Sequence, residues 1–186
     1  MDPWIWVIIA VVVIAIIALV VVLLMRRRSR RLKKQFGPEY DRTVERLDSK
    51  DAAHEELERR AERHESYHLR SLDDAERDRY VQRWRQLQRQ FVKEPANGLL
   101  EADKLLTDLL EDVGYPTGSF DQQAADLSVE HADVTDDYRS GRAVVRDVHH
   151  GHAGTEEIRQ ALLHYRAVFE RVAGADVTAD SDEAVS

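Results

Sequence analysis

The feature that most constrains this chain is an uninterrupted apolar run of 22 residues, from Trp4 to Met25. A helix of that length rises about 33 Å, which matches a bilayer hydrocarbon core of about 30 Å. Valine and isoleucine dominate the run, and in lipid a helix satisfies its own backbone hydrogen bonds. Trp4 and Trp6 stand at its outer end, where indole rings favour the membrane interface. We therefore predict a transmembrane anchor over residues 1–25, in contact with the bilayer through residues 4–25.

A secretory signal peptide is the alternative explanation of the run. Signal peptides carry a basic start, an apolar stretch of about 7–15 residues and a cleavage site of small residues. Here the start is Met1-Asp2-Pro3, the run is longer, and Arg26, Arg27 and Arg28 stand where a cleavage site would be expected. We therefore expect an anchor that is not cleaved.

A basic juxtamembrane segment, residues 26–36, follows the run. It holds seven of the 27 basic residues of the chain: Arg26, Arg27, Arg28, Arg30, Arg31, Lys33 and Lys34. Basic residues beside a span usually stay in the cytoplasm, which predicts a single-pass cell-membrane protein with its N-terminus outside and its soluble domain cytoplasmic. The inverted orientation stays open, because charge bias is not absolute. The seven side chains are also expected at the membrane surface, although we interpret them chiefly as determinants of orientation.

The rest of the chain is strongly acidic. Residues 35–186 hold 20 basic and 34 acidic side chains, a net charge of −14. Such a domain is a poor nucleic-acid binder, because duplex binding needs a basic face that releases counterions. The chain has no cysteine, which excludes a disulfide framework, cysteine zinc ligands and a thiol nucleophile. We therefore expect no nucleic-acid partner.

Beyond residue 36 the apolar residues recur at helical spacing, and no stretch alternates as a strand does. Gly37 and Pro38 interrupt the chain, since proline restricts the residue before it and suits the first turn of a helix. Gly114 and Pro116 end another helical stretch in the same way. The expected helices cover residues 38–47, 51–68, 72–92, 95–113, 120–127, 134–148 (weakened by Gly141) and 155–172. Ser71, with Asp74 three residues later, is the expected N-cap of the third of these.

This pattern predicts an all-α fold, in which an N-terminal transmembrane helix precedes an irregular bundle of about five or six helices. The expected organisation is an anchor at 1–25, the basic segment at 26–36, a helical soluble domain at 37–172 and a disordered acidic tail at 173–186.

His64-Glu65-Ser66-Tyr67-His68 matches the HExxH pattern. Two histidines four residues apart on one helix face can bind Zn²⁺, and the adjacent glutamate can act as general base. No third ligand stands out, however, and His64 and His68 also continue an apolar stripe from Leu57 and Ala61. We therefore expect no cofactor and no metal, and keep His64 and His68 as the candidate ligands of an alternative function.

A short histidine tract, His149-His150-Gly151-His152, offers a second possible metal site. Its glycines favour a solvated loop, and whether it binds metal in the cell stays open.

Arg159 and His164 fit the Arg-x4-His pattern of a class of all-helical ribonucleases. The pattern also occurs at Arg59/His64 and Arg63/His68, so it has little specificity in this chain. Five residues turn a helix by about 140°, which places the two side chains on different faces. The acidic charge further disfavours an RNA substrate.

Several segments resemble an uncharacterised bacterial family of single-pass, membrane-anchored helical proteins. The most specific is Phe-Gly-Pro-Glu-Tyr-Asp at residues 36–41, within the stretch 36–44; the others are Tyr80 with Trp84, Phe91 and Val92, Gly114-Tyr115-Pro116, Asp126-Leu127-Ser128-Val129, Thr155-Glu156-Glu157, Arg159-Gln160-Ala161 and His164-Tyr165-Arg166. Members are often labelled "secreted" or "membrane" protein with no activity attached. The resemblance implies a membrane-anchored helical protein and supplies no catalytic residues. Its "secreted" label conflicts with the orientation inferred from charge, which we retain.

An anchor, a helical domain and no coherent active-site motif together indicate a membrane-anchored, cytosolic protein-interaction domain, an adaptor or scaffold without catalytic activity. Its protein partner and oligomeric state are not specified by the sequence, and no small-molecule substrate is identified. The alternatives are a membrane-tethered zinc-dependent hydrolase using His64, Glu65 and His68, and a ribonuclease using Arg159 and His164.

Overall fold

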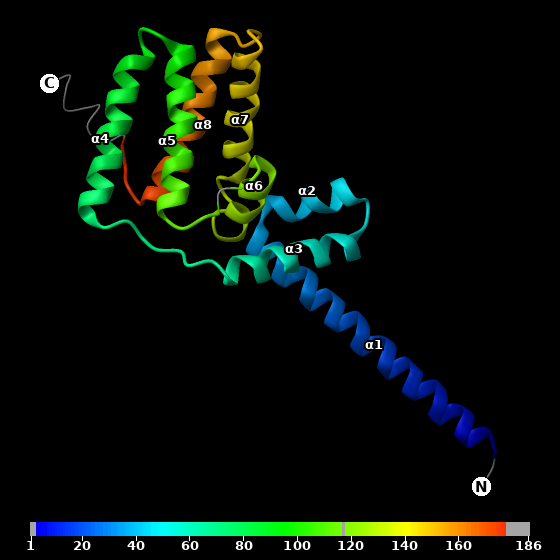
Figure 1. Ribbon diagram of the computed structural model, residues 1–186. Helices are drawn as coiled ribbons and strands as arrows, with labels where there is room; N and C mark the ends of the chain where they lie inside the picture. Colours follow the sequence, from blue (N-terminus) through cyan, green and yellow to red (C-terminus); the bar gives the residue numbers. More distant parts are fainter. Residues whose placement is uncertain (1–2, 117, 178–186) are drawn as a thin grey trace, which may run out of the picture. The chain divides into compact units, whose positions relative to one another are not determined.

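The computed structural model describes residues 3–116 and 118–177, and for residues 3 and 5–10 only the backbone. These residues form eight helices and no strand, which confirms the predicted all-α class (Figure 1). The helices are α1 (Pro3–Phe36), α2 (Pro38–Leu47), α3 (Lys50–Glu65), α4 (Asp74–Phe91), α5 (Pro95–Asp112), α6 (Phe120–Glu130), α7 (Thr135–His149) and α8 (Thr155–Ala173). Within this part of the chain seven helices follow α1, one for each of the seven helical stretches expected from the sequence, and more than the bundle of about five or six. The chain divides into two compact units, Met1–Glu58 and Arg59–Ser186.

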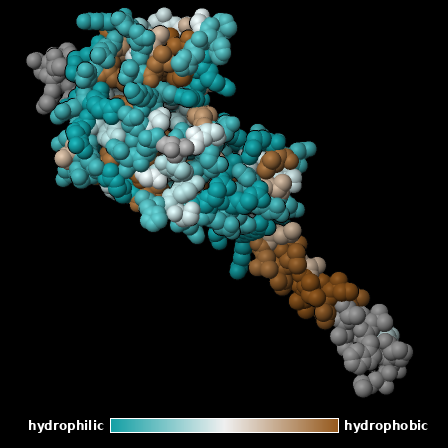
Figure 2. Space-filling view, in the orientation of Figure 1, coloured by the Kyte–Doolittle hydropathy of each residue, from teal (hydrophilic) through white to brown (hydrophobic). Residues whose placement is uncertain are grey.

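Helix α1 is a single helix through both the apolar run and the basic segment. From Val11 to Met25 its large apolar side chains are all exposed, and Figure 2 shows them as a continuous hydrophobic stretch. Counting only described residues, none of the helices is both long and apolar enough to cross a membrane.

The first unit is built from the C-terminal part of α1, α2 and the beginning of α3. Gly37 separates α1 from α2 with a φ of 49°, a conformation that favours glycine, and Pro38 occupies the first turn of α2. Apolar side chains from all three helices are buried here: Leu32, Phe36, Tyr40, Ala53 and Leu57. A hydrogen-bonded chain joins the same helices, because Tyr40 Oη lies 2.8 Å from Ser29 Oγ and 3.0 Å from His54 Nε2. Burial lowers the pKa of His54, which favours the neutral ring.

The second unit has a bundle of four long helices, α4, α5, α7 and α8 (Figure 1). Helix α8 packs against α5 and α7, and α4 packs against α5, while the shorter α6 packs against α7. In the core, the rings of Trp84 and Phe169 stack with centroids 4.8 Å apart. The core also takes in Ala173 and Val177, two residues of the stretch assigned to the acidic tail. Residues 178–186 of that predicted tail lie outside the described residues.

Gly141 stands at the contact of α7 with α8 and is not a weak point of the helix. A Cβ atom at this position would lie 2.3 Å from Cε1 of Tyr165. Only glycine therefore lets the buried Tyr165 ring pack directly on the α7 backbone.

Helix α3 ends at Glu65, three residues before the predicted end at His68. Ser66 and Tyr67 form turn hydrogen bonds to Arg63 and His64, and the chain then leaves the helix. Two long-range contacts hold the following segment: Tyr67 Oη donates to Asp126 at 3.0 Å, and the Arg70 amide donates to the Val113 carbonyl at 3.0 Å. A Cβ at Gly114 would lie 2.6 Å from the His68 carbonyl oxygen, so this crossing also needs a glycine.

Candidate functional site

A cleft of about 340 Å³ opens in the second unit where four segments meet. We call it the α8-end cleft. The connection before α4, the C-terminal end of α5, the end of α6 and the C-terminal end of α8 form its walls. Its size is at the lower end of the range for ligand-binding pockets. The lining is amphipathic, with apolar side chains such as Leu69, Leu72 and Val113 beside polar ones such as Arg70, Arg77 and His131.

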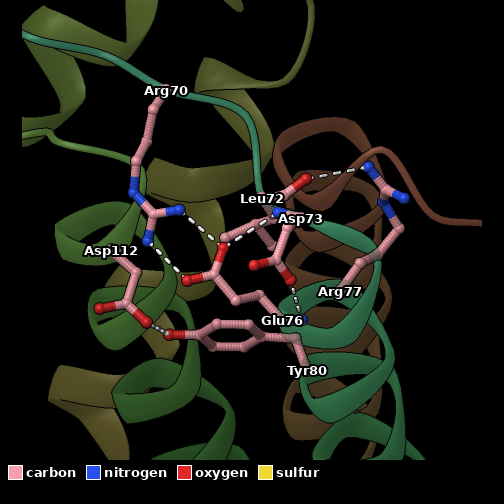
Figure 3. A network of polar contacts seen from close by, with 7 residues as sticks. All are labelled: Arg70, Leu72, Asp73, Glu76, Arg77, Tyr80 and Asp112. Atoms are coloured by element: carbon pink, nitrogen blue, oxygen red, sulfur yellow. Dashed lines mark hydrogen bonds and ion pairs between the residues drawn. The ribbon is translucent and has the colours of Figure 1, made fainter.

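The start of α4 fixes one wall through a capping box, in which Asp73 is the N-cap in place of the predicted Ser71 (Figure 3). The Asp73 side chain accepts the Glu76 amide at 2.7 Å, and the Glu76 carboxylate accepts the Asp73 amide at 3.0 Å. Arg70 adds a two-pronged ion pair to the same carboxylate, at 2.6 and 2.9 Å. The Arg70 guanidinium, followed by the Asp73 amide, lowers the pKa of Glu76 to about 2. The carboxylate therefore stays ionised and holds the loop against the helix.

Arg77 joins three segments around the cleft. Its Nη2 donates to the Leu72 carbonyl at 3.2 Å (Figure 3). Its Nη1 donates to Asp74 at 2.7 Å, and its Nε donates to the Ala173 carbonyl at 3.2 Å. Ala173 is the last residue of α8, where helix carbonyls lack intrahelical partners. A single side chain thus connects the loop before α4 with the end of α8.

Tyr80 connects α4 to α5 below the capping box. Its Oη donates to Asp112 at 2.7 Å (Figure 3). Burial, and then the Asp112 carboxylate, raises the pKa of this phenol, so the hydroxyl remains a donor.

Several buried polar atoms at or beside the cleft lack a hydrogen-bond partner among the described residues. They are Tyr115 Oη, His131 Nδ1, His64 Nε2 and Arg63 Nε. Tyr115 and His131 line the cleft itself, and Tyr115 is 5% exposed. Native proteins leave few buried polar groups unpaired, because each costs about 1–3 kcal/mol. The concentration of such atoms in one place therefore marks this cleft as a candidate binding site.

Glu130 lies near two of these residues, His64 and Tyr115. Its Oε2 lies 3.7 Å from His64 Nε2, beyond hydrogen-bond distance, and its negative charge acts on Tyr115. Burial first, and then the charge of Glu130 and a long hydrogen-bond interaction with the same carboxylate, raises the pKa of Tyr115. Burial also lowers the pKa of His131. Both groups are therefore neutral near pH 7 and able to exchange hydrogen bonds with a ligand.

A fully buried carboxylate, Asp126, connects two segments of the second unit near the cleft. Asp126 is 0% exposed and accepts hydrogen bonds from Tyr67 at 3.0 Å and from Gln122 at 2.8 Å. Arg63 Nη2 lies 3.8 Å from Asp126 Oδ1, the oxygen that also accepts from Gln122, and adds a longer-range charge interaction. This arrangement fixes the segment after α3 beside α6.

The HExxH residues do not adopt the geometry that the zinc alternative requires. His64 lies in the last turn of α3, whereas His68 follows the helix end, so the two rings do not share a helix face. His64 is partly buried, while Glu65 and His68 are exposed. Over residues 3–116 and 118–177, no three histidine or acidic side chains are grouped so as to hold a metal ion.

The histidine tract forms the turn after α7. His150 Nδ1 lies 2.6 Å from the Arg146 carbonyl oxygen, and the His150 and His152 rings stack with centroids 6.2 Å apart. The first of these contacts is the kind that satisfies a carbonyl at a helix C-terminus.

Arg159 and His164 have separate partners on α8. Arg159 donates to Glu156 at 2.9 and 2.6 Å, whereas His164 Nδ1 lies 2.6 Å from Asp137 on α7. The structure therefore engages each of them in its own acidic contact and does not bring them into one site.

The seven basic residues of the juxtamembrane segment fall into two groups. Arg28 donates to Glu58 at 2.7 and 2.5 Å, and Lys33 donates to Asp41 at 2.9 Å, so these two stabilise the first unit. The others are exposed and form neither a hydrogen bond nor an ion pair with a described residue: Arg26, Arg27, Arg30, Arg31 and Lys34.

Comparison with known proteins finds no matching family model, no matching curated protein and no matching solved structure. The resemblance to a family of membrane-anchored helical proteins therefore stays a prediction.

Sequence patterns did not identify the α8-end cleft. Its polar residues come from four segments that are far apart in the chain, including Arg70, Tyr115, His131 and Arg171. None of them stands in a recognisable motif. Tyr115 alone stands in a pattern that the sequence analysis noted, Gly114-Tyr115-Pro116. That pattern predicted the end of a helix but not which residues the tyrosine contacts.

Proposed function

We propose that this protein is a membrane-anchored helical interaction module. In this proposal α1 holds the chain in a bilayer, and the α8-end cleft binds a segment of a partner protein. The chain acts by binding and not by catalysis.

The exposed apolar surface of α1 supports the membrane anchor. Ile14, Ile17 and Leu19 are 65%, 57% and 59% exposed, and the neighbouring large side chains are exposed to a similar degree on every side of the helix. A helix that is apolar all round requires an apolar environment, such as a protein core or a membrane. The apolar run continues in the sequence to Trp4, and its full length of 22 residues suffices for a span.

The positions of the basic residues support a cytoplasmic location of the helical units. All seven follow the run, and no Lys or Arg precedes it in the sequence given. Short segments rich in lysine and arginine are retained on the cytoplasmic side.

The observation that carries the interaction function is the set of unpaired buried atoms in an otherwise well-fixed cleft. Tyr115 and His131 line the cleft beside Leu69, Leu72 and Val113. The Oη of Tyr115 and the Nδ1 of His131 are buried without a hydrogen bond inside the part of the chain that the structure describes. An extended polypeptide offers both amide hydrogen bonds and apolar side chains, so it complements this mixed lining. Pairing the two atoms would recover the free energy that their burial costs.

Site-specific photo-crosslinking in cells tests this proposal. A photoreactive amino acid is placed at Ser71, which is exposed and lines the cleft, or at Gln82, which is exposed on α4 and does not line it. We expect a discrete crosslinked product only from the Ser71 position. When His131→Leu is added to the chain with the photoreactive residue at Ser71, we expect less of the crosslinked product. The substitution removes one of the unpaired atoms with little change in side-chain volume.

Equal products from both positions, or no product from Ser71, would contradict the interaction function. A product formed with a protein from outside the cytoplasm would agree with the interaction function but contradict the cytoplasmic location of the helical units.

A further inference from the structure

The basic residues of α1 form a distinct face of the helix. Arg26, Arg30 and Lys34 follow each other at intervals of four residues, and Arg27 and Arg31 form a neighbouring row. At 100° per residue these five positions occupy an arc of about 140°. The structure leaves all five side chains exposed.

The opposite face of the same helix segment is buried within the first unit, where α1 packs with α2 and α3. Leu32 and Phe36 are 1% and 0% exposed, and Ser29 contacts Tyr40. Arg28 and Lys33 flank this buried face and are held by Glu58 and Asp41. Two cations are thus paired within the unit, whereas the other five are exposed and form no ion pair with a described residue, although the charge of Arg31 still acts on Glu58.

We propose that this exposed basic face, Arg26, Arg27, Arg30, Arg31 and Lys34, binds the anionic headgroups of the bilayer that α1 enters. The proposal rests on the membrane anchor proposed above and goes beyond it, because an anchor requires only apolar contact with lipid.

The depth of the residues along α1 fits this partner. With a rise of 1.5 Å per residue, Arg26 lies about 2 Å beyond Met25 and Lys34 about 14 Å beyond it. The headgroup region of one leaflet is about 5–8 Å deep, so Arg26, Arg27 and Arg30 fall within it. Arg31 and Lys34 lie beyond it but within roughly one Debye length, or about 8 Å, of its surface.

Charge complementarity selects anionic lipid over neutral lipid. A lysine or arginine near an anionic membrane surface gains about 1 kcal/mol, which corresponds to about a fivefold preference for each residue. The paired Arg28 and Lys33 already neutralise carboxylates and have less to gain. The lipid contact is therefore expected to depend on which cations are removed and not only on how many.

Lipid selectivity of the reconstituted full-length protein tests this inference. The chain is incorporated into phosphatidylcholine vesicles that contain trace spin-labelled phosphatidylglycerol or spin-labelled phosphatidylcholine. Electron paramagnetic resonance then gives the fraction of each label that is immobilised at the protein. We expect at least about a fivefold preference for phosphatidylglycerol at low salt, decreasing as the ionic strength rises.

Two matched double variants separate the exposed face from total charge. Arg30→Gln/Lys34→Gln removes two exposed cations, whereas Arg28→Gln/Lys33→Gln removes two paired cations at similar depth. We expect the first to lower the preference severalfold more than the second. Both variants keep Arg26 and Arg27 and the whole apolar run, and circular dichroism verifies that each remains helical.

A wild-type protein without lipid preference, or equal losses in the two variants, would overturn the inference while the anchor stands. Failure of the wild-type chain to enter the vesicles would instead overturn the anchor. Inorganic phosphate, added at constant ionic strength, is expected to leave the preference unchanged. Its loss would show a site for free phosphate and would overturn the assignment to lipid.

Discussion

Two buried tyrosines near the α8-end cleft differ in a single contact. Tyr80 and Tyr115 are both 5% exposed, but Tyr80 Oη donates to Asp112 at 2.7 Å, whereas Tyr115 Oη makes no hydrogen bond of normal length within the described residues and interacts with Glu130 at longer range. A buried hydroxyl stabilises a fold only when it is paired. The pair therefore provides an internal comparison of a phenol with a short hydrogen bond and a phenol without one.

We predict opposite effects of removing the two hydroxyls. Tyr80→Phe should lower the free energy of unfolding by about 1 kcal/mol, because it deletes a made hydrogen bond. Tyr115→Phe should leave the stability unchanged or raise it by up to about 1 kcal/mol, because it deletes an unpaired group. Urea denaturation of the full chain in detergent, followed by circular dichroism, measures both. Equal destabilisation would mean that Tyr115 is paired within the fold.

Gly141 lies where the Tyr165 ring of α8 packs directly on the backbone of α7. Gly141→Ala should destabilise the second unit by about 1–3 kcal/mol, because the new methyl group would overlap the Tyr165 ring. Ser140→Ala is the matched control, since Ser140 is the preceding residue of α7 and is exposed. If both substitutions changed the melting temperature equally, α7 and α8 would not be in the close contact described here.

Among the elements, the sequence predicted those helices best whose ends are marked by glycine or proline. Pro38 and Pro95 begin α2 and α5, and Gly114 follows the end of α5, as such residues do in general. The end of α3 was predicted less well. Its sequence stays compatible with a helix to His68, but the contacts of Tyr67 and Arg70 with α6 and α5 override that preference.

The same reason explains why the candidate site was not foreseen. The HExxH interpretation assumed that one helix carries both histidines, which is a local property, and the end of α3 invalidates it. The cleft, in contrast, depends on four chain segments that tertiary contacts bring together. Periodicity within one segment holds no information about such contacts.

The start of α4 gives a pH-dependent prediction. The pKa of Glu76 is about 2 in the fold against an ordinary value of 4.5, so this carboxylate stabilises the fold fully above pH 4.5. That stabilisation is lost as the pH falls from 4.5 towards 2. Glu76→Gln should therefore lower the melting temperature at pH 7 and make it less sensitive to pH over this interval.

Thermal melts of the full chain in detergent, taken at intervals between pH 7 and pH 2, measure the effect. Glu101→Gln is the control, because Glu101 is exposed on α5 and has no hydrogen bond or ion pair within the described residues. It should leave the melting temperature unchanged at pH 7. If Glu76→Gln behaved in the same way, the ion pair with Arg70 would contribute nothing to stability.

At the scale of the whole molecule, charge and apolar surface are divided between the parts of the chain. The long apolar surface belongs to α1, the exposed cations follow it directly, and acidic residues outnumber basic ones beyond residue 34. This division fits a protein held at a membrane by one end, whose remaining units are available to a partner. The orientation and the lipid contact both depend on the insertion of α1 in a bilayer.

Membrane extraction of the full-length chain tests whether α1 is inserted in the membrane. The membrane fraction of cells that express the protein is washed with alkaline carbonate, which releases proteins that are not inserted. We predict that the wild-type chain stays in the pellet. Val13→Arg/Ile17→Arg should be released, because each arginine near the centre of a span costs about 2.5–3.5 kcal/mol of insertion free energy. Val92→Arg, at a position 83% exposed in the second unit, should stay in the pellet. Release of the wild-type chain by carbonate would show that α1 is not a membrane anchor.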